Sequence, residues 1–211
     1  MTAFRCEWAE QHLKRDPKVV FDVGCYDGAD SVDFKEYWPE ARVVAFEADP
    51  EIFRNNAQRG RMRLAGVESH HAAVMDRDGE VEFHPTLSTD LTGYFGASGS
   101  VLTPNGDFSF RHPTISFKPA CRVPCLRLDS FCRDHGIAAI DLLHIDAQGA
   151  ELSVLNGLGD ILPAIVFLEI DEVAGISVYE NAVPAEELAG WFSGRGYRLA
   201  WKSQNDALYL R

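Results

Sequence analysis

Residues 19–28, which read VVFDVGCYDG, constrain the fold of this chain more than any other segment. The first five are mainly β-branched and aromatic, which is typical of a strand buried on both faces, and Asp22 lies where that strand ends. Gly24 and Gly28 lack a Cβ atom, so the backbone can turn sharply there and approach a ligand closely. We expect a helix over residues 29–37, with its free N–H groups facing the loop. The segment therefore predicts a strand, a nucleotide-binding loop and a helix.

The composition is that of an ordinary globular domain. With 211 residues, 46% of them hydrophobic and 25% charged, the chain is expected to form a single domain over residues 1–211. A formal net charge of −12 argues against nucleic-acid and anionic membrane partners, so a small molecule is the expected ligand. The chain has no apolar run of about 18 residues and no signal-peptide core, so a cytoplasmic location is expected. The sequence does not indicate an oligomeric state.

The residues that commonly bind metals show no diagnostic spacing. The five cysteines form neither CxxC pairs nor zinc-finger spacings with histidine, so free, buried thiols are expected. Asp146, Glu169 and Asp171 offer oxygen ligands that would suit Mg²⁺ or Ca²⁺, but no motif enforces such a site. We therefore predict no metal site.

Strand-like and helix-like segments alternate along the chain, which predicts an α/β fold with a parallel sheet covered by helices on both faces. Residues 80–84 are expected to form a hairpin with the third strand, across a turn at residues 77–79. Residues 197–202 and 207–211 are expected to close the chain as an antiparallel pair. The other expected elements are strands at residues 42–47, 67–74, 122–127, 141–146 and 165–171, and helices at residues 50–59, 129–135, 150–156 and 184–195.

Hydrophobic periodicity disappears between residues 85 and 119, where Gly, Ser, Thr, Asn and Pro are abundant. A loop of that length inside a compact domain is usually functional or disordered. Its aromatic residues, which include Tyr94, Phe95 and Phe110, favour a segment that packs on the rest of the protein. We therefore expect a lid-like loop insertion over residues 85–119.

The acid that follows the second strand indicates a ribose-binding site. Glu47 lies 23 residues after Gly24, where a carboxylate can accept hydrogen bonds from both hydroxyls of a ribose. Tyr26 replaces the second glycine of a dinucleotide loop, and Asp27 adds a negative charge that would repel a pyrophosphate. The same charge favours the sulfonium and ammonium groups of S-adenosylmethionine. The loop therefore predicts this methyl donor, with a NAD(P)-dependent oxidoreductase and a non-catalytic nucleotide-binding module as the alternatives.

Several motifs resemble, in order and spacing, those of the FkbM family of S-adenosylmethionine-dependent methyltransferases. They are DVGCYDG, FEADP at residues 46–50, HHAAV before DRDGEVEFHP, RLDSF at residues 127–131 and LLHIDAQGAELSVLNG at residues 142–157. The resemblance extends from about residue 18 to the C-terminus, and its IDxQGxE element is the most specific part. It implies a Rossmann-like class I methyltransferase fold, with a mostly parallel seven-stranded sheet whose last strand is antiparallel.

The resemblance also implies which residues bind the methyl donor. Asp22 and the glycine loop would hold the methionine end, Glu47 the ribose, and residues 71–74 would border the adenine. Asp146 and Gln148 would lie near the methyl group and the acceptor. The expected cofactor-binding residues are Asp22, Gly24, Tyr26, Asp27, Gly28, Glu47, Ala48, His71, Ala72, Ala73, Asp146 and Gln148.

Two residues are candidates for a base that removes a proton from a hydroxyl acceptor. Asp146 is expected where donor and acceptor meet, and His144 stands where many members of the family have a lysine. A neutral imidazole can act as a base, which an ammonium cannot, but His144 alternatively points to the other side of its strand. His112 in the insertion is a further candidate. Glu151 either orients the loop at residues 146–151 or simply places a favourable charge in the first turn of a helix.

The acceptor is expected to be a small molecule, such as a sugar or a secondary metabolite, methylated on a hydroxyl oxygen. The family implies this class, and the insertion is expected to select the individual compound. Its candidate contact residues are Asp90, Thr92, Ser98 and Ser100 for hydrogen bonds and Tyr94, Phe95 and Phe110 for stacking.

Overall fold

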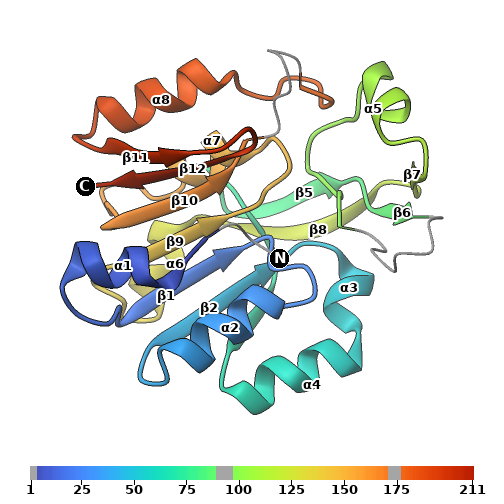
Figure 1. Cartoon of the computed structure of the whole chain (residues 1–211). Coiled ribbons are helices and arrows are strands. Elements are labelled where there is room, and N and C mark those ends of the chain that lie inside the picture. Colours follow the sequence, from blue (N-terminus) through green and yellow to red (C-terminus); the bar gives the residue numbers. More distant parts are fainter. Residues whose placement is uncertain (1–3, 89–96, 171–176) are drawn as a thin grey trace.

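The computed structural model describes residues 4–88, 97–170 and 177–211. A seven-stranded sheet forms its centre (Figure 1). Its strands are β1 (Val19–Val23), β2 (Arg42–Glu47), β3 (Glu68–His71), β9 (Leu142–Ile145), β10 (Ile165–Glu169), β11 (Arg198–Lys202) and β12 (Asp206–Leu210). In space they follow the order β11-β12-β10-β9-β1-β2-β3. The strands expected at residues 19–23 and 42–47 have those bounds in the structure.

The last strand of the chain is inserted into the sheet in the reverse direction. β12 runs antiparallel to both of its neighbours, β10 and β11, whereas β1 pairs in parallel with β2 and β9. β11 therefore points the same way as the core strands. The closing antiparallel pair and the antiparallel last strand are both confirmed.

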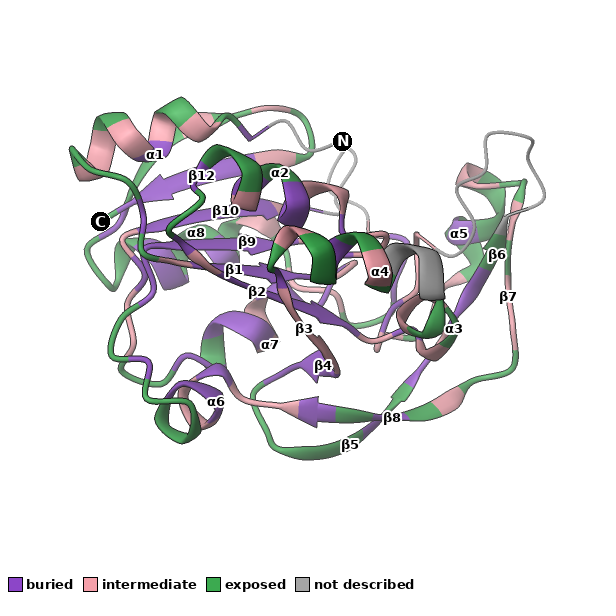
Figure 2. Ribbon diagram, turned by 90° about the horizontal axis from the view of Figure 1, so that it is seen from below, coloured by how far each residue is buried: buried purple, intermediate pink, exposed green. Residues whose placement is uncertain are grey.

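Helices cover both faces of the sheet, as expected (Figures 1 and 2). One face packs against α1 (Cys6–Leu13), α2 (Ala29–Tyr37) and α4 (Asn56–Ala65), and the other against α6 (Leu128–Asp134), α7 (Glu151–Asn156) and α8 (Ala185–Ser193). Successive side chains of a strand point to opposite faces. Val20 accordingly lies in the first core, with α2, and its neighbour Phe21 lies in the second, with α6.

The helix expected over residues 50–59 is divided. α3 (Pro50–Arg54) ends at Asn55, whose extended backbone separates it from α4. The start of α3 agrees with the sequence, because the Asp49 carboxylate accepts hydrogen bonds from the backbone N–H groups of Glu51 (2.7 Å) and Ile52 (3.2 Å). Pro50 occupies the first turn, where its missing N–H costs nothing.

The prediction of a hairpin between the third strand and residues 80–84 is wrong. The segment at residues 67–74 divides at Ala72, so that β3 belongs to the main sheet and β4 (Ala73–Val74) to a second, three-stranded sheet. There β8 (Cys121–Leu126) lies between β4 and β5 (Gly79–Phe83), pairing in parallel with β4 and antiparallel with β5. The apolar side chains that this sheet buries come from all three strands, so β8 provides a partner that a two-stranded hairpin would lack.

The insertion has more regular structure than a loop. β6 (Thr86–Ser88) pairs antiparallel with β7 (Ile115–Phe117), and α5 (Gly106–Arg111) lies between them in the chain. Phe108 of α5 is buried against Val178 and Tyr179. The described part of the insertion therefore packs on the segment that follows β10.

All five cysteines are free thiols, as expected, but only Cys25, Cys125 and Cys132 are buried, whereas Cys6 and Cys121 are half-buried. Within the residues that the structure describes, no helix combines the length and the apolar character needed to cross a membrane.

Candidate active site

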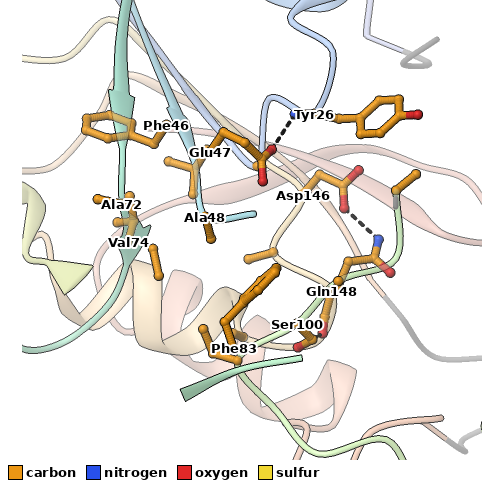
Figure 3. Close-up of a pocket in the computed structure, with 18 residues that line it drawn as sticks. Tyr26, Phe46, Glu47, Ala48, Ala72, Val74, Phe83, Ser100, Asp146 and Gln148 are labelled. Atoms are coloured by element: carbon orange, nitrogen blue, oxygen red, sulfur yellow. Dashed lines mark hydrogen bonds between the residues drawn. The ribbon is translucent and has the colours of Figure 1, made fainter. Parts of the chain in front are cut away.

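A cavity that is partly open to solvent lies beyond the carboxyl ends of β1, β2 and β9 (Figure 3). Ligands of open parallel sheets bind at that edge. Its walls come from the loops after β1, β2 and β9, from the chain between β3 and β4, from Phe83 of β5 and from the insertion. The cavity therefore joins the glycine loop to the insertion.

The loop after β1 owes its path to Gly24. This residue has φ +80°, and a Cβ atom there would come within 1.8 Å of the Asp146 carbonyl oxygen. Glycine thus lets the loop after β1 touch the loop after β9. Gly28 also has a positive φ, but a Cβ there would meet the Met62 side chain of α4 at 2.3 Å. Its small size therefore serves helix packing, not the close approach of a ligand.

Glu47 is held at the cavity wall by backbone hydrogen bonds. Its two carboxylate oxygens accept from the backbone N–H groups of Tyr26 (2.8 Å) and Asp49 (2.6 Å). Burial raises the pKa of Glu47 to about 8, although these hydrogen bonds act in the opposite direction. Each carboxylate oxygen can accept more than one hydrogen bond, so both oxygens can still accept from a ligand.

A second polar group lies after β9 and at the end of β10. The Gln148 side-chain amide donates to Asp146 Oδ1 (2.7 Å) and to Glu169 Oε2 (3.2 Å). Burial, the nearby Asp146 carboxylate and the hydrogen bond between the two acids raise the pKa of Glu169 to about 9. Glu169 therefore favours its protonated form, beside the Asp146 carboxylate that lines the cavity.

Hydrogen bonds connect this group to the insertion. The Ser100 hydroxyl donates to the Gln148 carbonyl oxygen (2.8 Å). The Tyr179 hydroxyl donates to the Ser98 carbonyl oxygen (2.8 Å) and lies 3.2 Å from Gln148 Oε1. Glu151 is buried, and its carboxylate accepts from the backbone N–H of Gly149 (3.0 Å), which is the contact that a loop-orienting role requires.

Asp22 and His144 are not among the described residues that line the cavity. They are paired across β1 and β9, and His144 Nδ1 lies 2.8 Å from Asp22 Oδ1 on the α2 face of the sheet. The Ser31 hydroxyl of α2 also donates to Asp22. Both side chains thus differ from the position expected from the sequence, because strand alternation directs them to the α2 face and not into the cavity. The alternative orientation of His144 is the one observed.

The environment of His144 is that of a core residue. Its ring lies between Phe34 (5.8 Å between ring centroids) and Phe167 (5.6 Å). Burial by itself would lower the pKa of His144, but the hydrogen bond and negative charge of Asp22 outweigh it and raise the pKa above its ordinary value.

Other expected residues lie beside the cavity rather than on its wall. Asp27 accepts from the backbone N–H of Ala29 (2.9 Å), and His71 stacks on Phe53 with Nε2 3.1 Å from the Ala48 carbonyl oxygen. The expected cofactor residues that do line it are Gly24, Tyr26, Glu47, Ala48, Ala72, Ala73, Asp146 and Gln148.

Only some of the acceptor-binding residues expected in the insertion lie at the cavity or within the described residues. Ser100 lines the cavity, whereas Phe110 is 88% exposed and is not among the described lining residues. His112 contacts Phe108 of α5 and is not among the described lining residues. Asp90, Thr92, Tyr94, Phe95 and Asp171 lie outside the described residues.

Sequence reasoning missed Tyr179 and Phe83 as site residues. Phe83 lines the cavity, and Tyr179 is buried beside Gln148. Tyr179 follows the fifth core strand, at the edge where ligands bind, and that position was the available signal. No comparable sequence signal points to Phe83, because its place depends on the pairing of β5 with β8.

Known proteins are similar to this chain over most of its length. A family model described as the methyltransferase FkbM domain matches residues 22–199. The 2-O-methyltransferase NoeI of Sinorhizobium fredii is 33% identical over 176 residues, which cover 82% of this chain and 70% of that protein. The AMB antimetabolite synthetase AmbE of Pseudomonas aeruginosa is also 33% identical, over 205 residues that cover 86% of this chain and 10% of the synthetase.

Solved structures resemble the chain at the level of the fold. Methyltransferase FkbM from Methylobacillus flagellatus has a TM-score of 0.56 at 14% identity, with 93% of this chain and 44% of that chain covered. The precorrin-6y C5,15-methyltransferase of Geobacter metallireducens has a TM-score of 0.50 at 11% identity, with 97% of this chain and 85% of that chain covered. The architecture is that of class I methyltransferases.

Proposed function

The chain belongs to the FkbM methyltransferase family, and from that premise we propose that its cavity binds S-adenosylmethionine and directs the methyl group to a hydroxyl oxygen of a small molecule. The observation that carries the proposal is that Glu47, at the end of β2, and Asp146, just after β9, both line one cavity (Figure 3). One acid follows the second strand, where a ribose is bound in folds of this kind, and the other lies next to the insertion.

The residues present fit this donor. Glu47 can accept hydrogen bonds from both ribose hydroxyls, and such donors favour the ionised carboxylate over the protonated form that burial favours. Ala48, Ala72 and Ala73 offer a small, apolar surface for a flat adenine ring. The Asp146 carboxylate suits the sulfonium and ammonium groups.

Positioning is the main contribution that we assign to the protein. The donor, when bound, supplies an already activated methyl group on its sulfonium. The apolar wall formed by Phe83, Val101 and Ala97 would exclude water from the transfer and hold the acceptor in line.

We assign Asp146 as the residue that accepts the hydroxyl proton of the acceptor. Gln148 donates to Oδ1 of Asp146, so Oδ2 can receive the acceptor O–H. Glu169 is protonated at neutral pH and can donate to Asp146, so it would hold that carboxylate in place. A base of this kind contributes about 10² to 10⁴-fold to the rate.

The acceptor class follows from charge and from a relative. The curated relative NoeI is a 2-O-methyltransferase, which supports transfer to oxygen. With a net charge of −12 we expect neither nucleic acid nor an anionic membrane as the acceptor, and we propose a small molecule such as a sugar or a secondary metabolite. The five free thiols favour a reducing compartment, so we propose that the reaction takes place in the cytoplasm.

Titration calorimetry with S-adenosylmethionine, S-adenosylhomocysteine and NADH tests the donor. We expect the first two to bind and NADH not to bind. Glu47→Gln should lower the affinity for both sulfur compounds by about 10 to 100-fold, because it removes a charge-assisted hydrogen bond. Glu82→Gln, at an exposed position, is the matched control. Binding of NADH alone would refute the proposal. Labelled methyl transfer into candidate hydroxyl compounds then tests the acceptor.

A further inference from the structure

Two imidazoles and one carboxylate meet away from the cavity, at the outer edge of the main sheet. Glu68 and His70 lie on the edge strand β3, and His135 follows α6. One potential ligand atom of each lies within 4.8 Å of the others. These three residues are not part of the described cavity wall, so methyl transfer leaves them without a role.

The hydrogen bonding of His135 prepares one ring nitrogen for a metal. His135 Nδ1 lies 2.9 Å from the Phe131 carbonyl oxygen. A carbonyl oxygen can only accept, so Nδ1 carries the hydrogen, and Nε2 of the neutral ring has a lone pair. Histidines that bind metals commonly donate their other N–H to a backbone carbonyl, which sets the tautomer and the ring orientation.

Aromatic packing holds both imidazoles in place. His135 stacks on Phe131, with 3.9 Å between the ring centroids. His70 stacks on Phe46 (5.6 Å) and meets the edge of Phe131 (4.8 Å). Because neighbouring rings already restrict their rotamers, a bound ion would cost little further side-chain entropy.

Glu68 has one oxygen facing the cluster and one facing away. Arg42 donates to Oε2 from Nε (3.1 Å) and from Nη2 (2.9 Å), whereas Oε1 lies 2.8 Å from His70 Nε2. A carboxylate whose outer oxygen is hydrogen-bonded is a typical metal ligand. The nearby guanidinium repels a cation, so the ion must gain its affinity mainly from the two imidazoles.

We propose that Glu68, His70 and His135 bind one Zn²⁺ ion, with water as a fourth ligand. Two imidazoles and a carboxylate suit zinc, whereas Mg²⁺ and Ca²⁺ prefer oxygen ligands alone. Around a tetrahedral zinc with bonds of about 2.0–2.1 Å, ligand atoms lie about 3.3 Å apart. The 2.8 Å contact between Glu68 and His70 therefore opens slightly, and the wider separations, which reach up to 4.8 Å, close by side-chain rotation. Zinc takes the place of the hydrogen at His70 Nε2: that proton passes to water and the neutral ring takes up one proton at Nδ1, so no net proton is released.

Such an ion would connect the edge strand β3 to the end of α6. An ion that binds the folded chain and not the unfolded one stabilises the folded state by mass action. The site would therefore be structural, and it lies on elements that the sequence spacing did not bring together, since Glu68 and His135 are 67 residues apart.

The experiment uses the full chain, purified without a histidine tag and dialysed against a chelator. Calorimetric titration with ZnCl₂ is expected to show one equivalent bound, with a higher melting temperature in its presence. His135→Gln is expected to lower the affinity by at least about tenfold, the loss usual even for a supporting residue of a metal site. His12→Gln, which changes a half-buried histidine of α1, is the matched control and should bind like the wild type.

Two further measurements make the result decisive. Glu68→Gln should also lose zinc, and circular dichroism confirms that each variant is folded, which the exposed position of His135 favours. Absence of zinc binding to the wild type would overturn the proposal. It would also be overturned if His135→Gln bound zinc with the affinity of the wild type, because the ion would then be bound elsewhere, by cysteines. S-adenosylmethionine affinity should be unchanged in all variants, so failure of the zinc site leaves the proposed donor site intact.

Discussion

Gly24 lies so close to Asp146 that a Cβ atom at residue 24 would come within 1.8 Å of the Asp146 carbonyl oxygen. The backbone N–H of Asp146 also donates to the Val23 carbonyl oxygen (2.8 Å). The glycine loop and the loop after β9 are therefore packed directly on one another. A change in the first must displace the second, although 122 residues separate Gly24 from Asp146.

Gly24→Ala is expected to affect both stability and donor binding. The new methyl group overlaps a backbone atom, and alanine is strained at φ +80°, so the free energy of unfolding should fall by roughly 2–4 kcal/mol. Displacement of Asp146 should weaken S-adenosylmethionine binding, measured by calorimetry. Gly60→Ala in α4 has no atom within 4 Å of its Cβ and should be slightly stabilising, by about 0.5–1 kcal/mol. Similar stabilities for the two variants would contradict the packing argument.

Asp146→Asn should separate binding from turnover. Asparagine can still accept the Gln148 hydrogen bond through its oxygen, so the loss of the negative charge should weaken donor binding much less than it slows turnover. The rate of methyl transfer should fall by about 10² to 10⁴-fold, because the base is lost. Single-turnover assays with labelled donor measure this, with the exposed Asp160→Asn as the control. Full turnover by Asp146→Asn would exclude it as the base.

The Glu169 carboxyl should make the folded state less stable as the pH rises. Its pKa is about 9 in the folded chain, against an ordinary value of 4.5, because of burial and the neighbouring Asp146. Between these pH values the folded chain keeps a proton that the unfolded chain has lost, so the free energy of unfolding falls with increasing pH. Glu169→Gln removes this dependence. Urea denaturation at pH 5, 7 and 9 measures the free energy of unfolding of both proteins. The stability of the variant relative to the wild type should increase as the pH rises. A difference that does not change with pH would contradict the pKa assigned to Glu169.

Tyr179→Phe is expected to loosen the insertion. It removes the hydroxyl that donates to Ser98 and lies beside the Gln148 side chain. The free energy of unfolding should fall by about 0.5–1.5 kcal/mol. The acceptor KM should rise more than the donor Kd, because the contact lies on the insertion side of the cavity. Tyr37→Phe, which removes a half-exposed hydroxyl of α2, is the matched control. An unchanged acceptor KM would exclude this positioning role.

His144→Ala should lower the free energy of unfolding and leave the rate of methyl transfer unchanged. The substitution leaves the buried Asp22 without its imidazole partner, and breaking a buried pair costs about 3–5 kcal/mol. The raised pKa of His144 means that this stabilisation is complete below about pH 6.5 and is lost as the pH rises through the folded value. The kcat of the folded fraction should be unchanged in methyl-transfer assays. A large fall in kcat would indicate that His144 acts as a base in the reaction.

Local sequence was sufficient for most elements of the main sheet. The apolar runs at residues 19–23 and 42–47 have the composition of buried parallel strands, and the structure gives them those bounds. The cap at Asp49 and the start of α3 follow from side-chain chemistry within a few residues. The family motif at residues 142–157 and the place of Glu47 after β2 also depend on neighbouring residues alone.

Only the tertiary structure decided which distant groups meet. β5 pairs with β8 and not with β4, because strand pairing depends on which apolar faces can be buried together, and local alternation does not contain that information. The direction of a side chain at a strand end is likewise set by packing, which turned Asp22 and His144 into the core. Tyr179 reaches Gln148 through the same long-range packing. The sequence by itself thus determined the family, the main strands and the acid after β2, while the fold decided which polar side chains share the cavity.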